Sequence, residues 1–577
     1  MKKLVIKLSL SIFAFGITNL IYAQDLDKGV LNWYNGDAGM KTEAAYKKVK
    51  KRESKTVIVA IIDSGIDIEH EDLKGKIWTN TDEIPENGID DDNNGYIDDV
   101  HGWNFLGNAN GQNANSMRLE RTRLVAKWAD KFEDADPATL NASEKKDYAT
   151  YMQAKEELEE ERASYEGYVQ QLEIIPMIMA SVPGYIEKEL GAGYTLKDLK
   201  KWSPTDPEQQ QMRSLAIAME TGDLKLEDIE AQRKQIQGML DTHHNVDFNG
   251  REVIGDDPDD FSDVKYGNPD VEGPDALHGT HVGGIVGAIR GNKLGGDGVA
   301  ENVLLMSIRA VPDGDEYDKD IALAIRYAVD NGAEIINMSF GKGYSPHAKE
   351  VYAAFEYADS KGVLLVHAAG NDSKDLDDRS NTNFPTSMYD FQTKKLDHFL
   401  TIGSMTRQGK VVAEKPEKIV LAKDASKEEK AEAKAEMARA KAAYKRKKKS
   451  KMPLPSRFSN YGQTHVDVFA PGSEIYNAVP QSDYQELQGT SMASPMVAGA
   501  AAFLKSYFPE VSMKEIKEVL LASATSYKGS MQVLPGEKDD FNTDAVENAV
   551  DFGTLSVTGS VINLENAVMM LLAKEKK

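Results

Sequence analysis

The sequence feature that most constrains the fold is the unbroken apolar run TVIVAII at residues 56–62. It is rich in β-branched residues and shows no polar alternation, which is typical of a parallel strand buried on both faces. Similar runs recur at Val303–Ile308, Glu334–Met338, Val363–His367 and Phe399–Ile402. Helices are predicted between them, for example at Lys319–Asn331 and His347–Lys361, each followed by a glycine. This alternation predicts an α/β fold with a mostly parallel sheet, covered by helices on both faces and binding ligands at the carboxyl ends of its strands.

Two stretches interrupt the alternation. Residues 106–250 lack strand signals, and apolar or aromatic residues recur at every seventh position from Tyr151 to Leu172, until Pro176. This pattern predicts a helical insertion. Residues 416–452 are rich in Ala, Lys and Glu and end in a basic run, which predicts an exposed helix or helical hairpin.

Capping residues mark helix ends within the first insertion. Asn141 and Glu144 have the spacing of a capping box at a helix start. Asp206 followed by Pro207 predicts another start, and Gly222 predicts the end of that second helix. We therefore expect at least two well-delimited helices there.

The N-terminus has the pattern of a secretory signal peptide over residues 1–23. Lys2 and Lys3 precede an apolar run from Leu8 to Tyr22, and Ala23 and Gln24 offer a cleavage point. A membrane anchor is disfavoured because the run is short and no charged residue enforces a stop. The sequence thus predicts an exported protein, either periplasmic or secreted.

Composition excludes several classes of protein. Lys and Arg number 69 against 93 Asp and Glu, so the net charge of −24 argues against a general affinity for nucleic acid. There is no cysteine, which rules out disulfides and lipid attachment through an N-terminal cysteine. No later segment is long and apolar enough to suggest a stable membrane span after signal cleavage.

Three short motifs contain the residue types of a nucleophilic triad. In IIDSGID, residues 61–67, Asp63 stands where the first buried strand ends, and a carboxylate there can orient an imidazole. In HGTHVGG, residues 278–284, His278 directly precedes an apolar helical run whose small residues allow close packing on the sheet. His281, one turn further on, is interpreted as a packing or hydrogen-bonding residue.

The third motif, GTSMASPMVAG at residues 489–499, places Ser491 at the start of a predicted helix. Exposed backbone N–H groups and the helix dipole favour developing negative charge at such a position. The alternative is that Ser491 merely caps the helix. Small residues on both sides of Ser491 instead indicate that a substrate approaches closely.

Together, in the order Asp, His, Ser, these motifs resemble those of the subtilisin-like serine peptidases. NMSFG at residues 337–341 resembles the substrate-binding strand of that family, and AAGN at residues 368–371 resembles the segment with its oxyanion asparagine. The resemblance implies a three-layer subtilisin-like α/β domain that hydrolyses protein or peptide substrates. Its parts would be residues 24–105, 251–415 and 453–577, interrupted by the helical insertion 106–250 and the charged insertion 416–452.

The resemblance also implies a role for each matching residue. His278 would take the proton from Ser491 Oγ, which attacks the peptide carbonyl and forms an acyl-enzyme, while Asp63 orients His278. The side-chain amide of Asn371 and the backbone N–H of Ser491 would hold the oxyanion. The substrate backbone would pair as an added strand with Ser339, Phe340 and Gly341.

Two rival functions are weaker. A binding or scaffolding protein on a silent peptidase fold would usually have lost a triad or oxyanion residue, and none is replaced here. A lipase-like or esterase hydrolase would carry its serine in a G-x-S-x-G turn and in the order Ser, Asp, His. The motif around Ser491 is not that turn.

The resemblance leaves the insertion and the activation route open. The helical insertion separates the Asp63 and His278 motifs, and it could be a lid that selects substrates, a docking surface for a partner protein, or a stabilising elaboration. The segment between Ala23 and Asp63 is too short for a folded prodomain of the usual kind. We therefore expect folding without a prodomain, or regulation through the insertion. Cleavage specificity and oligomeric state are not indicated.

An acidic loop at residues 90–99, DDDNNGYIDD, predicts a calcium site. Asp90, Asp92, Asn94 and Asp98 supply oxygen ligands at positions 1, 3, 5 and 9 of an EF-hand-type loop, with glycine at the sixth. The twelfth position holds His101 instead of a bidentate glutamate, so a solvated acidic turn is the alternative. Calcium here would stabilise the domain and take no part in the reaction. No zinc site is proposed, because His243 and His244 lack a third ligand at recognisable spacing.

Overall fold

The computed structural model describes residues 30–407, 426, 430–431, 433–441, 455–532, 534–536 and 550–576. The predicted signal peptide and most of the charged insertion 416–452, with its basic run, lie outside these residues, although residues 433–441 are helical. The described chain forms two compact units. We call residues 25–120 and 250–577 the sheet unit, and residues 121–249 the helical unit.

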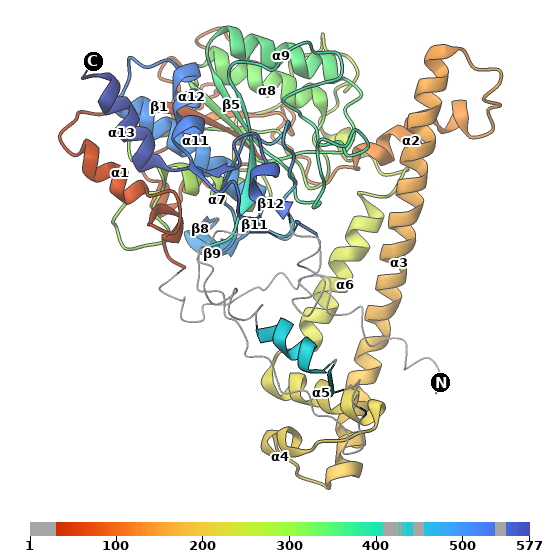
Figure 1. Ribbon diagram of the computed structural model, residues 1–577. Helices are drawn as coiled ribbons and strands as arrows, with labels where there is room; N and C mark the ends of the chain where they lie inside the picture. The colour runs from red at the N-terminus through yellow and green to blue at the C-terminus, as the bar shows by residue number, and fades with distance from the viewer. Residues whose placement is uncertain are drawn as a thin grey trace. The chain divides into compact units, whose positions relative to one another are not determined.

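A central sheet organises the sheet unit, and Figure 1 labels two of its strands, β1 and β5. It has nine strands in the order β10-β13-β7-β6-β5-β4-β1-β3-β2. All neighbours are parallel except β10 and β13. The strands are β1 Val57–Asp63, β2 Gly102–Asn104, β3 Val303–Arg309, β4 Ile335–Met338, β5 Leu364–Ala368, β6 Phe399–Met405, β7 Val468–Pro471, β10 Thr525–Ser526 and β13 Ser560–Val561. Two antiparallel pairs lie apart from it, β8 Ile475–Val479 with β9 Asp483–Leu487, and β11 Met531–Gln532 with β12 Val550–Asp551.

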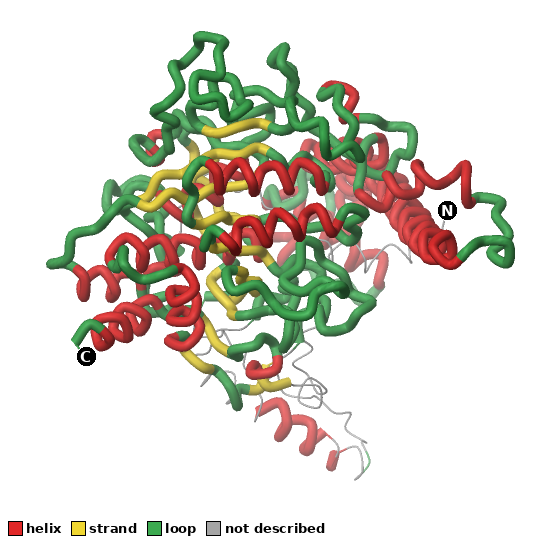
Figure 2. The backbone as a smooth tube through the Cα atoms, turned by 90° about the horizontal axis from the view of Figure 1, so that it is seen from above, coloured by secondary structure: helices red, strands yellow, loops and turns green. Residues whose placement is uncertain are grey.

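Helices cover both faces of this sheet, as Figure 2 shows. One core lies between the sheet and α8 Asp318–Asp330 and α9 Ala348–Ser360. The opposite core contains α1 Thr42–Val49, α7 Leu277–Gly287, α11 Thr490–Tyr507, α12 Met513–Ser523 and α13 Leu564–Lys574. Short 3-10 helices lie at Trp33–Asn35, Glu71–Leu73, Gly250–Val253 and Phe552–Thr554.

The residues of β1 explain why its sequence has no polar alternation. Val59 and Ile61 belong to the core under α7 and α11, whereas Ala60 and Ile62 belong to the core under α8 and α9. Successive side chains of a strand point to opposite faces, so both sets must be apolar when both faces are covered. The predicted mostly parallel α/β fold is confirmed.

The helical unit consists of α2 Glu120–Phe132, whose first residue belongs to the sheet unit, α3 Ala142–Leu190, α4 Leu196–Lys201, α5 Pro207–Thr221 and α6 Leu226–Asp241. Asn141 and Glu144 form the predicted capping box at the start of α3. Asp206 caps α5, and Gly222 ends it with a φ of 78°.

The sequence pattern is expected to end at Pro176. The helix does not end there, because α3 continues through Pro176 and Pro183 to Leu190. Each proline removes one backbone hydrogen bond. The apolar face of α3 continues, however: Met179 and Val182 are buried beyond Pro176, and Ile186 is buried beyond Pro183. Packing of this face outweighs the local loss.

Residues 106–120, which the sequence assigned to the helical insertion, lie in the sheet unit. Leu106, Ala114 and Met117 are buried in the core beneath α8. The backbone N–H of Ala114 donates to the carbonyl of Leu106 across a short turn. The separate unit therefore begins at Arg121.

Buried ion pairs hold the chain where it returns from the helical unit. The Arg251 guanidinium lies 2.7 Å from Asp320 and 2.8 Å from Asp256, and Asp256 lies 2.7 Å from the Lys319 ammonium. Asp320 and Lys319 belong to the first turn of α8. Each buried charge has an opposite partner, which offsets part of its desolvation cost.

A second buried group holds the chain where it leaves the sheet unit. Lys342 lies 2.7 Å from Glu120 and 2.8 Å from Asp318. Its ammonium also donates to the carbonyl of Glu316 at 2.8 Å. Lys342 directly follows the segment Ser339–Gly341, so this group joins the start of α2 to the end of that segment.

Within the described residues, we find no helix with both the length and the apolar character needed to cross a bilayer.

Candidate active site

The residues of the three motifs meet at the carboxyl end of β1. Asp63 is the last residue of β1, and His278 and Ser491 lie in the first turns of α7 and α11. Both helices contact β1 directly. Parallel strands present their carboxyl ends at one edge of the sheet, where ligands bind in folds of this kind.

Asp63 and His278 form a close pair. The Asp63 Oδ1 atom lies 2.6 Å from His278 Nδ1 and accepts a second hydrogen bond from the backbone N–H of Ser64 at 2.8 Å. Asp63 is only 1% exposed, so the attraction is weakly screened. Burial alone lowers the pKa of His278, but the charge of Asp63 and its hydrogen bond outweigh burial and raise the pKa above its usual value.

A glycine allows α7 to approach this edge. A Cβ atom added to Gly279 would lie 2.1 Å from the carbonyl oxygen of Gly65. That distance is far below van der Waals contact, so only glycine permits the position of His278 beside Asp63.

Ser491 adopts an orientation that the sequence did not predict. Its Oγ donates to the carbonyl oxygen of Ser339 at 3.2 Å. Among the described residues, no hydrogen bond joins Ser491 to His278. Proton transfer between them therefore requires the Ser491 side chain to rotate away from Ser339.

Two hydrogen-bond donors face a common space beside Ser491. The Asn371 Oδ1 atom accepts from the backbone N–H and the Oγ1 of Thr490, at 2.8 and 3.0 Å, which turns Nδ2 the other way. A Cβ atom added to Gly489 would lie 3.5 Å from Ser491 N and 3.6 Å from Asn371 Nδ2. Both nitrogen atoms therefore border the same space beside Gly489, and an anionic oxygen there could receive hydrogen bonds from them.

The segment Ser339–Gly341 is held against the start of α11. Ser339 Oγ donates to the carbonyl of Ser491 at 2.9 Å, and Asn337 Nδ2 donates to Ser339 Oγ at 2.9 Å. Ser494 Oγ completes this buried chain by donating to Asn337 Oδ1 at 2.8 Å. The segment is therefore fixed relative to Ser491.

Sequence reasoning missed Asn383, which lies beside the two segments expected to contact substrate. Its Nδ2 donates to the carbonyl of Ala369 at 3.0 Å. Added Cβ atoms at Gly341 and Gly370 would meet its Oδ1 at 2.6 and 3.2 Å. Asn383 follows no spacing rule relative to either segment, and only the fold brings it there.

His281 lies apart from the pair formed by Asp63 and His278. Its Nε2 atom lies 3.0 Å from the carbonyl of Ile475 and 3.1 Å from that of Gln485. Burial lowers its pKa to about 3, so the ring is neutral. His281 therefore connects α7 to the β8–β9 hairpin.

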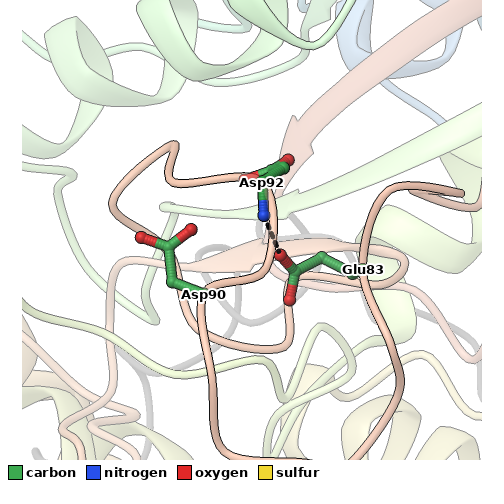
Figure 3. A group of neighbouring side chains, drawn as sticks. All are labelled: Glu83, Asp90 and Asp92. Carbon is green, nitrogen blue, oxygen red and sulfur yellow. Dashed lines mark hydrogen bonds between the residues drawn. The ribbon is translucent and has the colours of Figure 1, made fainter.

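The acidic loop brings together only part of the predicted calcium set. Carboxylate oxygens of Asp90, Asp92 and Glu83 lie within 4.8 Å of one another (Figure 3). Asp98 instead accepts hydrogen bonds from the backbone N–H groups of Asn87 and Gly88, at 3.0 and 2.9 Å.

The remaining predicted ligand, Asn94, serves the loop itself. Its backbone N–H donates to both Asp90 and Asp92, and its Oδ1 accepts from the backbone N–H of Tyr96 at 2.8 Å. Glu83 was missed because it precedes the loop and matches no motif. The fold brings it in, since Glu83 Oε1 accepts from the backbone N–H groups of Asp91 and Asp92.

Comparison with known proteins places this arrangement in a family. The subtilase family model matches residues 54–553, and the chain therefore belongs to the subtilase family of serine peptidases. The chain is 32% identical over 266 residues to the thermophilic serine proteinase of Bacillus sp. (strain AK1), which covers 46% of this chain and 49% of that protein. It thus spans about half the length of that relative.

Other known proteins are also similar to this chain. The chain is 30% identical over 250 residues to subtilisin DY of Bacillus licheniformis, covering 43% of this chain and 70% of that protein. It is also 30% identical over 285 residues to the halolysin-like extracellular serine protease Nep of Natrialba magadii, covering 49% of this chain and 41% of that protein. A solved structure of the subtilase cytotoxin SubAB aligns with 52% of this chain and 77% of that chain, with a TM-score of 0.37 and 21% identity.

Proposed function

We propose that this protein is an exported serine endopeptidase that cleaves peptide bonds through an acyl-enzyme, with Asp63, His278 and Ser491 as its catalytic triad. The observation that carries the proposal is the meeting of three features at one edge of the sheet. These are the Asp63–His278 pair, the Ser491 hydroxyl, and the two donors that face the space beside Gly489.

The first half of the reaction forms the acyl-enzyme. Ser491 Oγ rotates away from Ser339, gives its proton to His278 Nε2 and forms a bond to the scissile carbonyl carbon. Asn371 Nδ2 and Ser491 N donate to the oxyanion. Asp63 stabilises the imidazolium. The C–N bond then breaks, and the leaving amine takes the proton from His278.

The second half regenerates the enzyme. His278 takes a proton from water, whose oxygen attacks the acyl carbon to form a second tetrahedral intermediate. This collapses, the C–O bond to Ser491 breaks, and His278 returns the proton to Ser491 Oγ. The released product carries the new carboxyl group.

The substrate is proposed to be an extended polypeptide. Ser339–Gly341 follow β4 and pair with no described strand, so their outer edge can accept a substrate backbone as an added strand. Such pairing favours peptides and unfolded segments over compact domains.

The test uses a fluorophosphonate probe on the purified mature protein, beside Ser491→Ala. Labelling of the wild type that is absent from the variant is expected, because only an activated serine reacts. Ser506→Ala is the matched control, since Ser506 lies at the far end of the same helix and should leave labelling intact. The proposal would be refuted, and a silent binding fold favoured, if neither the well-folded wild type nor a well-folded variant without the helical unit were labelled.

Export is proposed on the N-terminal pattern of residues 1–23, and the name of the Natrialba magadii relative describes an extracellular protein. Expression in a native-like host should yield a protein beginning near Gln24 outside the cytoplasm, as read by intact mass. Recovery of the uncleaved chain in the cytoplasm would oppose this.

We also propose that the acidic loop binds calcium through Asp90, Asp92 and Glu83. Three carboxylates that converge within 4.8 Å fit a hard cation that prefers oxygen ligands. Bound calcium would neutralise their mutual repulsion and stabilise the loop, and it would take no part in the reaction. Removal with EGTA should lower the melting temperature of the wild type but not that of Asp92→Asn.

A further inference from the structure

Within the described part of the chain, the side chain of His367, in β5, makes one polar contact, and the reaction does not use it directly. It is 1% exposed, and its Nε2 lies 2.8 Å from the carbonyl oxygen of Phe340. Because a carbonyl only accepts, Nε2 must carry the hydrogen. The other ring nitrogen, Nδ1, is buried and has no hydrogen-bond partner among the residues that the structure describes. The imidazole therefore serves one acceptor, at the cost of an unsatisfied nitrogen.

The acceptor lies in the middle of the segment proposed to bind substrate. β4 and β5 stay in register as far as the pair Met338 and His367. Beyond Met338, residues 339–341 pair with no described strand, and backbone pairing resumes at Lys342 with Phe384. The Phe340 carbonyl thus accepts a hydrogen bond from the side chain of His367. If the pairing of β4 with β5 continued, a backbone N–H would donate to this carbonyl instead.

The direction of the Phe340 carbonyl fixes the directions of the neighbouring carbonyl groups. In an extended segment, neighbouring carbonyl groups point to opposite edges. The Phe340 carbonyl faces His367, and the Ser339 carbonyl faces the Ser491 hydroxyl, 3.2 Å away. The Ser339 and Gly341 peptide groups are then the ones directed to the edge where a substrate would lie.

We propose that His367 is a positioning residue for substrate binding, which fixes the Phe340 carbonyl inward and so presents Ser339 and Gly341 to the backbone of an extended peptide. The proposal rests on the proposed function of the same site. His367 touches neither the substrate nor the reacting atoms. His367 affects substrate binding only by holding the orientation of the segment Ser339–Gly341.

A side chain held in this way should affect binding more than chemistry. An interaction that acts equally in the ground state and the transition state changes KM and leaves kcat unchanged. His367→Phe keeps an aromatic ring but loses the Nε2–H donor to the Phe340 carbonyl. The segment Ser339–Gly341 must then become ordered when the peptide binds, and this ordering weakens binding. We expect KM for a tetrapeptide p-nitroanilide to rise about tenfold, with kcat within about twofold of wild type.

Two comparisons separate positioning from general damage. Hydrolysis of p-nitrophenyl acetate, which is too small to pair with the strand, should be unchanged in His367→Phe. His367→Gln carries an amide N–H near the position of Nε2 and should restore the peptide KM to within about threefold. If His367→Phe fails to fold, His367→Met provides the same comparison with a more adaptable side chain.

His70→Phe is the matched control for loss of a buried histidine. His70 is fully buried. Its Nε2 contacts the carbonyl of Asp483, and its Nδ1 accepts from the backbone N–H of Asp72, away from the substrate segment. We expect a loss of stability at least as large in this variant and an unchanged peptide KM. An unchanged KM in His367→Phe, or an equal change with p-nitrophenyl acetate, would overturn the proposal. Failure of the wild type to react with the fluorophosphonate would instead refute the proposed function.

Discussion

The space beside Gly489 leads to a quantitative prediction for Asn371→Ala. Asn371 has two separable contacts. Its Oδ1 accepts from Thr490 N and Thr490 Oγ1 at 2.8 and 3.0 Å, and its Nδ2 borders the same space beside Gly489 as Ser491 N. The Oδ1 contacts stabilise the folded protein, whereas the Nδ2 group stabilises only the negative charge that develops on the oxyanion during the reaction.

Loss of the Nδ2 donor should cost about 2.7–4 kcal/mol of transition-state stabilisation, equivalent to a 10²–10³-fold fall in kcat. KM should change little, because the donor acts on the oxyanion and not on the ground-state substrate. Loss of the two Oδ1 contacts should lower the free energy of unfolding by about 1–2 kcal/mol, since each hydrogen bond contributes about 1 kcal/mol net.

The assay combines steady-state kinetics on one peptide p-nitroanilide with urea unfolding. Thr490→Val separates the two contributions, because it removes the Oγ1 hydrogen bonds with Asn371 Oδ1 and with the backbone N–H of Gly370 but leaves the Asn371 amide in place. It should lose about 2 kcal/mol of stability and less than tenfold in kcat. The reasoning fails if Asn371→Ala keeps kcat within threefold of wild type, or if the two variants lose kcat equally.

Three further predictions concern other parts of the sheet unit. Asp63 raises the pKa of His278, and catalysis needs the neutral ring, so the activity of the wild type should fall as the pH drops below that pKa. Asp63→Asn should move this acid limb of the kcat/KM profile to lower pH and should lower kcat about 10⁴-fold. An unmoved limb would mean that His278 is not the titrating base. Arg251→Met leaves Asp320 buried without its partner and should lower the free energy of unfolding in urea by about 3–5 kcal/mol; a loss below 1 kcal/mol would contradict the burial of the pair. Asp92→Asn should abolish the calcium-dependent rise in melting temperature while sparing kcat, and a wild type without any such rise would exclude calcium from the loop.

Local patterns were sufficient for much of the fold. Five predicted strands, including residues 56–62, coincide with β1, β3, β4, β5 and β6 to within a few residues. The predicted glycine ends of α8 and α9 also hold, with φ values of 83° at Gly332 and 73° at Gly362. These features depend on side-chain periodicity and on backbone conformations that only a few residues adopt readily.

Where local signals compete with packing, the sequence was a poorer guide. Pro176 predicted the end of the heptad pattern, but α3 continues because its apolar face stays buried. Residues 106–120 carry no strand signal, yet they pack in the sheet unit through Leu106 and Met117. The same limit applies to the acidic loop, where Glu83 joins Asp90 and Asp92, while Asp98 bonds to backbone N–H groups.

The sequence by itself determined the α/β class and the motifs that contain Asp63, His278, Ser491 and Asn371, because each depends on residues close together in the chain. Only the tertiary structure decided the positions of Asn383 and His367, since contacts between distant segments follow no spacing rule. The orientation of Ser491 belongs to the same group. A hydroxyl rotates freely until its neighbours offer acceptors, and here the acceptor is the carbonyl of Ser339, in the segment that follows β4.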